Sequence, residues 1–426
     1  MTVLSSLHGI NNRSDHTRMK KSHFPDITRL SIFFALTLGI AQSAMAQEAE
    51  PVTTPGFGGP NAVENQMAED SETWVEWKTS LKEEYGLSLS GDYTSVLLYA
   101  TETSTDDTGA GGIARIYGTW DLMDEGVGAL VWKFEHRHAY GDTSPFSFSI
   151  GQMGYVGLQE PPFNDSDFRT QNLYWRQRLN GGRSTLIAGV LDVTDYLNAF
   201  ALASPWLHFM NFAFSTGSDA IGLPNDAAVG IAYGSMVSDN MYMIASITDT
   251  NGDPGKPFKG LDNFFSDREH FTSFEIGWTS SHERIIFDNT HITLWHKDRQ
   301  DAAGVPGGWG FAFSYSRYLN DNLMPFVRGG YADDGGSLLQ KSLSAGVGYQ
   351  PPNLPGLLGV GVNWGEPNES TFSPGLSDQL ALEVFYRFPL QDRIAITADT
   401  QWIKDPALNP SESTIWMFNV RARFTF

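Results

Sequence analysis

The sequence predicts an all-β protein: a sixteen-stranded antiparallel transmembrane β-barrel preceded by a short N-terminal periplasmic helix. Period-two alternation of apolar and polar residues runs from Gly86 to the last residue, Phe426, and tight turns alternate with long loops. The composition agrees, because 13% aromatic residues, 43 glycines and a mean hydropathy of -0.26 suit strands and turns better than Leu- and Ala-rich helices.

The first 46 residues have the features of a secretory signal peptide. Basic residues precede an apolar run over residues 30–40, and Ala44-Met45-Ala46 is a small-x-small cleavage pattern. The run is shorter than the roughly 20 apolar residues that span a bilayer. We therefore predict that residues 1–46 are a cleaved signal peptide, with Met19 as an alternative start.

The remaining composition excludes several classes of protein. No later stretch reaches about 18 continuous apolar residues, so a membrane could be crossed only by strands. The chain has no cysteine, which excludes disulfides, thiol nucleophiles and thiolate metal sites. Its formal net charge of -21 argues against nucleic-acid binding, which needs basic patches.

Three segments follow the signal peptide. Residues 47–70 are rich in Pro, Gly, Glu and Asn, and we expect a disordered lead-in. Residues 71–85 carry Trp74 and Trp77 at helical spacing, which predicts a short amphipathic helix at the barrel mouth. The helix is either part of the transport pathway or a surface cap with no role in transport. Residues 86–426 form the predicted barrel domain.

The strand pattern repeats sixteen times. The predicted strands are 86–100, 112–121, 128–138, 168–179, 183–191, 226–236, 240–248, 270–280, 284–296, 307–318, 323–331, 340–350, 357–364, 377–388, 393–402 and 414–426. Short connections include 180–182, 238–240, 320–322 and 391–392, and the long ones include 139–167, 192–225, 249–269, 297–306 and 403–413. Strict alternation of the two is typical of an up-and-down barrel with one periplasmic and one extracellular end.

Alternation also separates two faces within each strand. The last strand predicts a lipid-facing set of Trp416, Phe418, Val420, Ala422, Phe424 and Phe426, opposite Asn419, Arg421, Arg423 and Thr425. The second set is too polar for a dry core, because burying charges without water costs several kcal/mol each. We therefore expect a hydrated lumen, and a C-terminal strand ending in Phe426 that serves the barrel-assembly machinery as an assembly signal.

The order and spacing of several segments give the chain a resemblance to a known family. They are residues 87–94 (LSLSGDYT), 171–178 leading through 186–192 (LIAGVLD), the long segment 198–225, and 382–388 (LEVFYRF) followed by 402–410 (WIKDPALNP) and the terminal strand. By these segments the chain resembles the carbohydrate-selective porins of the OprB family over most of its mature length. The resemblance implies a sixteen-stranded pore with periplasmic termini, narrowed by inward-folded loops and lined by Arg and Glu that contact sugar hydroxyls.

The predicted pore-lining and substrate-selecting residues are the charged groups on the lumen face. They are Arg115, Glu135, Arg137, Arg176, Arg178, Glu275, Arg328, Glu383 and Arg387. The planar guanidinium of Arg and the carboxylate of Glu can both bind hydroxyl groups, and their opposite charges keep the net electric field in the lumen low. The alternative is that they form ladders that stiffen the wall and contact no solute.

The long connection 192–225 contains Trp206, Phe209 and Phe212, an aromatic content unusual for an exposed loop. We expect these residues to form a constriction loop whose rings meet the apolar faces of sugars. The alternative is that the rings anchor the loop to the wall. The connection 139–167 is similarly long and could meet it.

The predicted function is passive, carbohydrate-selective diffusion of small sugars through the outer membrane of a Gram-negative bacterium. The expected partners are small carbohydrates, outer-membrane lipids and lipopolysaccharide, with the protein a monomer or a trimer and without nucleic acid. A general or cation-preferring diffusion porin is the alternative; a lipid-hydrolysing barrel enzyme or a plugged structural barrel is less favoured. We expect no enzyme activity and no cofactor.

Two stretches have some of the residue types of a metal site. The run Glu135-His136-Arg137-His138 is not expected to bind a metal, because alternation sends its histidines to the face opposite Glu135. The Asp- and Asn-rich segment 249–267 could bind Ca²⁺ weakly, but it is better explained as a solvated loop. No metal site is therefore predicted.

Overall fold

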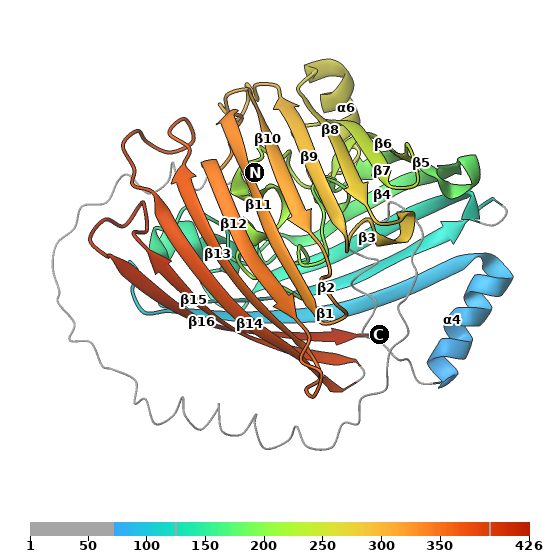
Figure 1. The fold of residues 1–426 in the computed structure, drawn as a ribbon. Coiled ribbons are helices and arrows are strands. Elements are labelled where there is room, and N and C mark those ends of the chain that lie inside the picture. The colour runs from blue at the N-terminus through green and yellow to red at the C-terminus, as the bar shows by residue number, and fades with distance from the viewer. Residues whose placement is uncertain (1–71, 124–125, 392) are drawn as a thin grey trace. The chain divides into compact units, whose positions relative to one another are not determined.

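The computed structural model describes residues 72–123, 126–391 and 393–426 (Figure 1). The predicted signal peptide and lead-in lie outside these residues. No helix in the described ranges is long and apolar enough to cross a membrane.

Sixteen antiparallel strands form one closed barrel in which each strand pairs with its neighbours in sequence (Figure 1). The strands are β1 Leu87–Ala100, β2 Thr108–Asp121, β3 Gly128–Ala139, β4 Asp167–Leu179, β5 Ser184–Leu191, β6 Ala228–Met236, β7 Met241–Asp249, β8 His270–Thr279, β9 Asn289–Lys297, β10 Gly308–Ser316, β11 Leu323–Asp334, β12 Leu339–Tyr349, β13 Leu357–Pro367, β14 Gln379–Gln391, β15 Ile394–Lys404 and β16 Thr414–Thr425. The barrel closes where β1 pairs with β16. The predicted fold is confirmed.

The helices are short apart from the first. They are α4 Glu72–Tyr85, α5 Pro145–Phe148 and α6 Lys259–Asp262, with 3-10 turns at Asn180–Gly182, Val193–Asp195, Phe212–Phe214, Thr216–Asp219 and His282–Arg284 and π-turns at Ser149–Met153 and Asn263–Asp267. All except α4 lie in the connections between strands, where they shape the loops.

The connections divide the barrel into two ends. Those that follow even-numbered strands define the turn end, where β1 begins and β16 finishes, and those that follow odd-numbered strands define the loop end. The predicted strict alternation of lengths fails after β11, where the loop-end connection is only residues 335–338. Gly335 and Gly336 make this tight turn possible because both have positive φ, at 72° and 73°.

One strand begins later than predicted. The apolar residues Ile285, Ile286 and Phe287 suggested that β9 starts near residue 284, but the strand begins at Asn289. A 3-10 turn precedes these residues, and the carbonyl of Ile286 accepts a hydrogen bond from the amide of Ala201 at 3.0 Å. Their apolar side chains therefore pack on an inward-folded loop, and the sequence pattern could not distinguish this contact from a strand.

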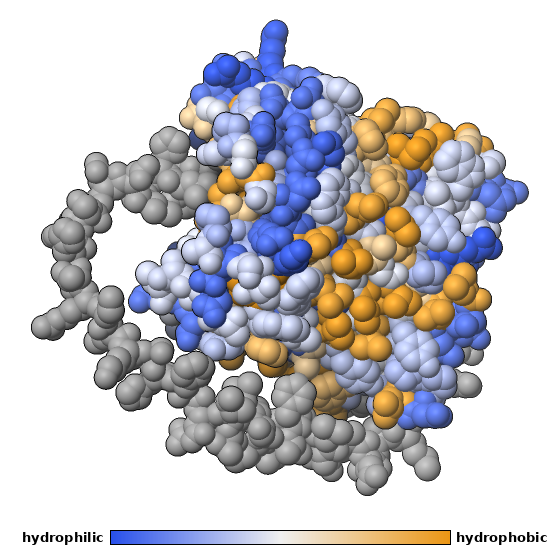
Figure 2. All heavy atoms as spheres, turned by 60° about the vertical axis from the view of Figure 1, so that its left-hand side comes forward, coloured by the Kyte–Doolittle hydropathy of each residue, from blue (hydrophilic) through white to orange (hydrophobic). Residues whose placement is uncertain are grey.

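The two faces of the wall follow the predicted alternation. On β16, Trp416 and Phe418 are exposed on the outer face, whereas Arg421 and Arg423 are buried in the lumen. On β10, Trp309 is likewise exposed. Figure 2 shows hydrophobic side chains gathered over the strands on one face of the barrel. An apolar outer wall around a polar interior is the arrangement that lipid requires of a barrel.

The helix α4 corresponds to the predicted amphipathic helix, and it lies at the turn end of β1 and β2 (Figure 1). Trp74 stacks on Trp77 with ring centroids 4.8 Å apart, and Lys82 pairs with Asp121 of β2. Trp77 remains exposed. The helix therefore caps the outside of the turn end and does not fill the lumen.

Deleting Phe426 is expected to reduce the amount of folded barrel in membranes severalfold. The Phe426 amide donates to the Gly91 carbonyl at 2.9 Å, and the Gly91 amide donates back at 3.1 Å, so the last residue closes the β1–β16 seam. Heat-modifiable migration of the purified membrane fraction measures the folded amount. The matched variant Phe426→Ala keeps both main-chain bonds and should assemble better than the deletion; wild-type folding of the deletion would contradict this role.

Candidate functional site

The connection between β5 and β6, here called the β5–β6 loop (residues 192–227), folds into the barrel. Its Leu197, Phe200 and Phe214 are buried, and its 3-10 turn at Thr216–Asp219 contacts β10, β11 and β12. In Figure 1 this segment lies within the ring of strands. The predicted inward folding of this loop thus decides which lumen side chains can meet a solute.

Two predicted pore-lining residues hold the beginning of this loop. Glu275 of β8 accepts hydrogen bonds from the Asn198 amide at 2.8 Å and from the Thr293 hydroxyl at 2.7 Å. Arg328 of β11 donates to the Asn198 carbonyl at 2.8 Å. Arg328 and Glu275 are fully buried. Both charges are therefore satisfied by the loop and the wall.

The middle of the loop is held in the same way on the next strands. The Glu383 carboxylate of β14 accepts from the amides of Met210 at 2.6 Å and Asn211 at 3.1 Å. Arg421 of β16 donates to the His208 carbonyl at 2.7 Å. These hydrogen bonds join backbone groups of the loop to buried side chains of β14 and β16, so this part of the wall fixes the loop position.

The connection between β3 and β4, here called the β3–β4 loop (residues 140–166), meets the β5–β6 loop. The Glu160 amide donates to the Met210 carbonyl at 2.8 Å, and the Phe212 amide donates to the Leu158 carbonyl at 2.9 Å. The Glu160 carboxyl also contacts Arg421 at 2.5 Å. Burial raises the pKa of Glu160 to about 7 although the Arg421 guanidinium opposes this shift. The two loops thus form one inner layer.

The predicted constriction-loop aromatics divide by burial. Phe209 is buried against Phe385 of β14, with ring centroids 4.9 Å apart, and Trp206 covers the Arg115 guanidinium at 3.5 Å. Phe212 is only half-buried. The structure therefore puts two of the three rings against the wall, where they favour the anchoring alternative, and leaves Phe212 partly accessible.

The opposite side of the lumen carries a cluster of paired charges that we call the acid–base wall. It consists of Lys133, Glu135 and Arg137 of β3, Arg169 of β4, and Asp192, Asp195 and Asp226 of the β5–β6 loop. Glu135 and Arg137 pair at 2.6 Å, and Asp226 lies 2.6 Å from Arg169 and 3.5 Å from Arg137. These two predicted pore-lining residues therefore belong to a larger network of alternating sign.

A β-bulge in β4 explains why sequence alternation missed part of the wall. Lys133 pairs with Asn172 but the next residue, Phe134, pairs with Thr170, so Gln171 is an extra residue. Gln171 and Arg169 consequently face the lumen, where Gln171 donates to Asp192 at 2.7 Å. Alternation counted back from Arg176 would assign them to the outer face. Lys133, in contrast, shares the face of Glu135 and could have been found by spacing alone.

Asp226 is far more accessible than the two guanidiniums with which it pairs. Its side chain is 43% exposed, whereas those of Arg137 and Arg169 are 3% and 6% exposed. Burial opposes its ionisation, but Arg169 and Arg137 outweigh this and lower the pKa of Asp226. A charged carboxylate backed by two guanidiniums thus faces water at this point of the lumen.

The other predicted residues lie in separate places. Arg115 pairs with Asp92 at 2.7 Å beneath the Trp206 ring. Arg176 lies 3.8 Å from Asp121 near the turn end, and Arg178 is half-buried nearby. The structure therefore brings the predicted residues together in small groups: Arg115 is the cross-strand neighbour of Glu135, which pairs with Arg137, and Glu275 and Arg328 meet at Asn198. Arg387 lines a cavity at the turn end described below.

The two stretches with metal-site residue types differ from a metal site in geometry. Glu135 is buried in the lumen, whereas His136 is exposed on the outer face of the same strand. Asp249 accepts hydrogen bonds from the amides of Val229 and Asn251. Within the described ranges no group of three or more His, Asp or Glu is arranged to hold a metal ion.

Comparison with known families gives one match. Residues 307–426 match the family described as "Carbohydrate-selective porin, OprB family". This segment covers strands β10 to β16 and contains Arg328, Glu383, Arg387 and Arg421. No curated protein matches the chain by sequence.

Solved structures share the fold at low sequence identity. The "High pH structure of Pseudomonas putida OprB" superposes with a TM-score of 0.64 and 13% identity, over 83% of this chain and 97% of that one. A mutant of Rh. blastica porin gives a TM-score of 0.50 and 12% identity, over 80% of this chain and 100% of that one. At these identities the likeness shows the fold alone, a sixteen-stranded porin-type barrel.

The fold, the family match of the last strands and the sequence segments that carry the resemblance agree, and the chain is identified as a porin-fold barrel that resembles the carbohydrate-selective porins of the OprB family.

Proposed function

We propose that the protein is an outer-membrane porin through which small sugars diffuse passively, and that the acid–base wall selects them. The observation that carries this proposal is the exposed Asp226 carboxylate between two buried guanidiniums, Arg137 and Arg169. The resemblance to carbohydrate-selective porins supports the sugar class.

The chemistry of the acid–base wall suits neutral polyols. Carboxylates accept hydrogen bonds from hydroxyl groups and guanidiniums donate to them, so adjacent opposite charges offer both functions to one sugar. Because Glu135 and Arg137 neutralise each other at 2.6 Å, the local field stays weak and a monovalent ion gains little there. A wall of one sign would instead favour ions.

The inner layer of loops supports selection by size. The β5–β6 loop contributes Asp192, Asp195 and Asp226 to the acid–base wall, and its other side is fixed to β8, β11 and β14. A solute passing the acid–base wall therefore meets a loop that is held in place. This arrangement favours monosaccharides over larger sugars.

The proposal includes the cellular setting. An apolar outer face and a C-terminal strand ending in Phe426 support insertion into a Gram-negative outer membrane, assisted by the barrel-assembly machinery and in contact with lipopolysaccharide. Residues 1–46 would be removed on export. The turn end would then face the periplasm, together with the helix α4.

Liposome swelling tests this function. Vesicles containing the protein should swell in glucose much faster than in a disaccharide, because the loop layer limits size. The variant Arg137→Gln is expected to slow glucose swelling severalfold and to shift ion preference toward cations, since Glu135 and Asp226 lose a shared partner.

The matched control is Arg183→Gln, which removes the same charge from an exposed turn-end arginine that pairs with Asp239. Its swelling rates should equal those of the wild type. Absence of swelling with every sugar would reject the porin function. A general diffusion porin would be favoured instead if a salt of similar size enters the vesicles as fast as glucose and the Arg137→Gln variant changes neither rate.

A further inference from the structure

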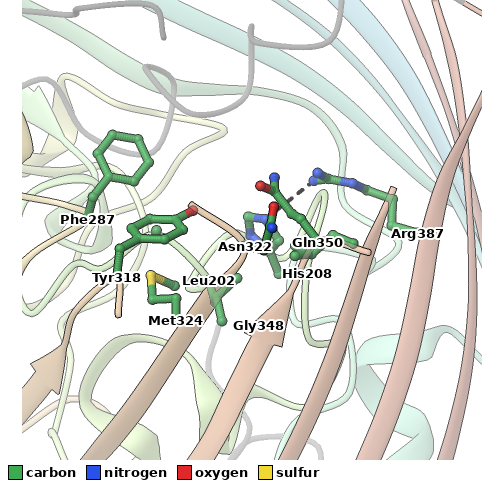
Figure 3. A pocket seen from close by; sticks show the side chains of 11 residues that line it. Leu202, His208, Phe287, Tyr318, Asn322, Met324, Gly348, Gln350 and Arg387 are labelled. Carbon is green, nitrogen blue, oxygen red and sulfur yellow. Dashed lines mark hydrogen bonds between the residues drawn. The ribbon is translucent and has the colours of Figure 1, made fainter. Parts of the chain in front are cut away.

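A cavity of about 60 Å³ lies at the turn end of the barrel, away from the acid–base wall. It is bounded by the β5–β6 loop, the turns before β9 and β11, and strands β11 to β14. Figure 3 shows Phe287 and Tyr318 on the side opposite Arg387, with His208 between them. Gln350 at its edge is exposed, so solvent reaches the cavity.

Arg387 contributes a positive charge that no carboxylate neutralises. No ion pair involves Arg387 among the described residues, and its charged neighbours are the guanidiniums of Arg421 and Arg423. Its Nη1 donates to His208 at 3.3 Å, and its buried Nε has no partner there. Arg421 and Arg423 differ, because Glu160 and Asp92 compensate them.

His208 holds one side of the Arg387 guanidinium in place. A guanidinium can only donate, so His208 Nε2 accepts from Arg387 and the proton of the neutral ring lies on Nδ1. Burial and the nearby charges of Arg387 and Arg421 lower the pKa of His208, which keeps the ring neutral. The Nδ1 atom is buried without a hydrogen-bond partner in the described part of the chain.

An uncompensated cation that lines a cavity matches an anion. A carboxylate in the cavity would accept a charge-assisted hydrogen bond from the Arg387 guanidinium and neutralise its charge. At about 15 Å³ for each water-sized group, the cavity holds about four such groups. That is room for a carboxylate with its neighbouring hydroxyls, while Asn322 and Gln350 can bind hydroxyl groups.

We propose that this cavity binds the carboxylate end of a small sugar acid, with Arg387 as its main contact. The site is distinct from the acid–base wall, which pairs its own charges and suits neutral sugars. It would hold an anionic solute at the turn-end mouth, so that the channel accepts sugar acids as well as neutral sugars.

The test is the block of ion current by glucuronate, added at the turn-end side of the full-length protein in planar bilayers. We expect Arg387→Gln to raise the half-blocking concentration at least about tenfold, the effect of losing a charge-assisted hydrogen bond. Arg387→Lys, which keeps the charge but not the fork, should give an intermediate loss and remains informative if the Gln variant folds poorly.

Arg317→Gln is the matched control, because Arg317 is an exposed arginine of the turn that carries Tyr318 but does not line the cavity. It should block like the wild type. Equal shifts in Arg317→Gln and Arg387→Gln, no shift in either, or displacement of glucuronate by equimolar chloride would overturn the proposal. Glucose swelling by the wild-type protein is measured separately, so a failed sugar-acid site and a failed porin function give different results.

Discussion

Replacing Glu383 with alanine is expected to raise the mean single-channel conductance and the open-channel noise. The Glu383 side chain accepts hydrogen bonds from the amides of Met210 and Asn211 at 2.6 and 3.1 Å, and a buried amide that loses its partner costs about 1–3 kcal/mol. Without them, two buried amides lose their partner and the middle of the β5–β6 loop populates detached positions. Recordings in planar bilayers measure both quantities.

The conservative variant Glu383→Gln should lie between the wild type and alanine, because its amide oxygen still accepts one of the two bonds. The matched control is Glu366→Ala, which removes a carboxylate paired with Lys341 on the exposed outer face. Its conductance should stay at the wild-type level. An unchanged or lower conductance in Glu383→Ala would show that the loop does not depend on this anchor.

The fold could be predicted almost completely from the sequence because a barrel wall obeys a short-range rule. Lipid on one side and polar lumen on the other force alternation at every second residue, and this placed Trp309, Phe418 and Arg421 on the correct faces. The exceptions are local. Ile285 and Ile286 bury their apolar side chains against a loop. A periodic sequence pattern cannot distinguish such a contact from a strand.

The site was predictable only as a set of candidates, because alternation gives the face of a residue and not its partner. Glu383 and Glu135 look equivalent in sequence, yet one holds the backbone of the β5–β6 loop and the other pairs with Arg137. Which one occurs depends on the path of a loop that has no periodicity. Asp226 was missed for this reason, and Arg169 because a single extra residue reversed the phase of β4.

Asparagine in place of Asp219 is expected to stabilise the barrel at high pH but not at low pH. Asp219 lies buried in the β5–β6 loop, and neither of its carboxyl oxygens has a hydrogen-bond partner among the described residues. Burial raises the pKa of Asp219 from 3.8 to about 8. The folded protein therefore keeps a proton that the unfolded chain has already lost over this pH range.

The sign follows from this difference in bound protons. The stability contributed by the protonated carboxyl is complete below about pH 4 and falls by roughly 1.4 kcal/mol per pH unit as the pH rises toward 8. The introduced asparagine does not titrate, so the melting temperature of Asp219→Asn relative to the wild type should increase from pH 4 to pH 9. The buried amide N–H groups of the asparagine change this difference in melting temperature by the same amount at every pH. The test is therefore the slope of the difference against pH. Asp321→Asn, in an exposed turn, is the control and should show no slope; a flat difference for Asp219→Asn would mean that the carboxyl is ionised in the folded barrel.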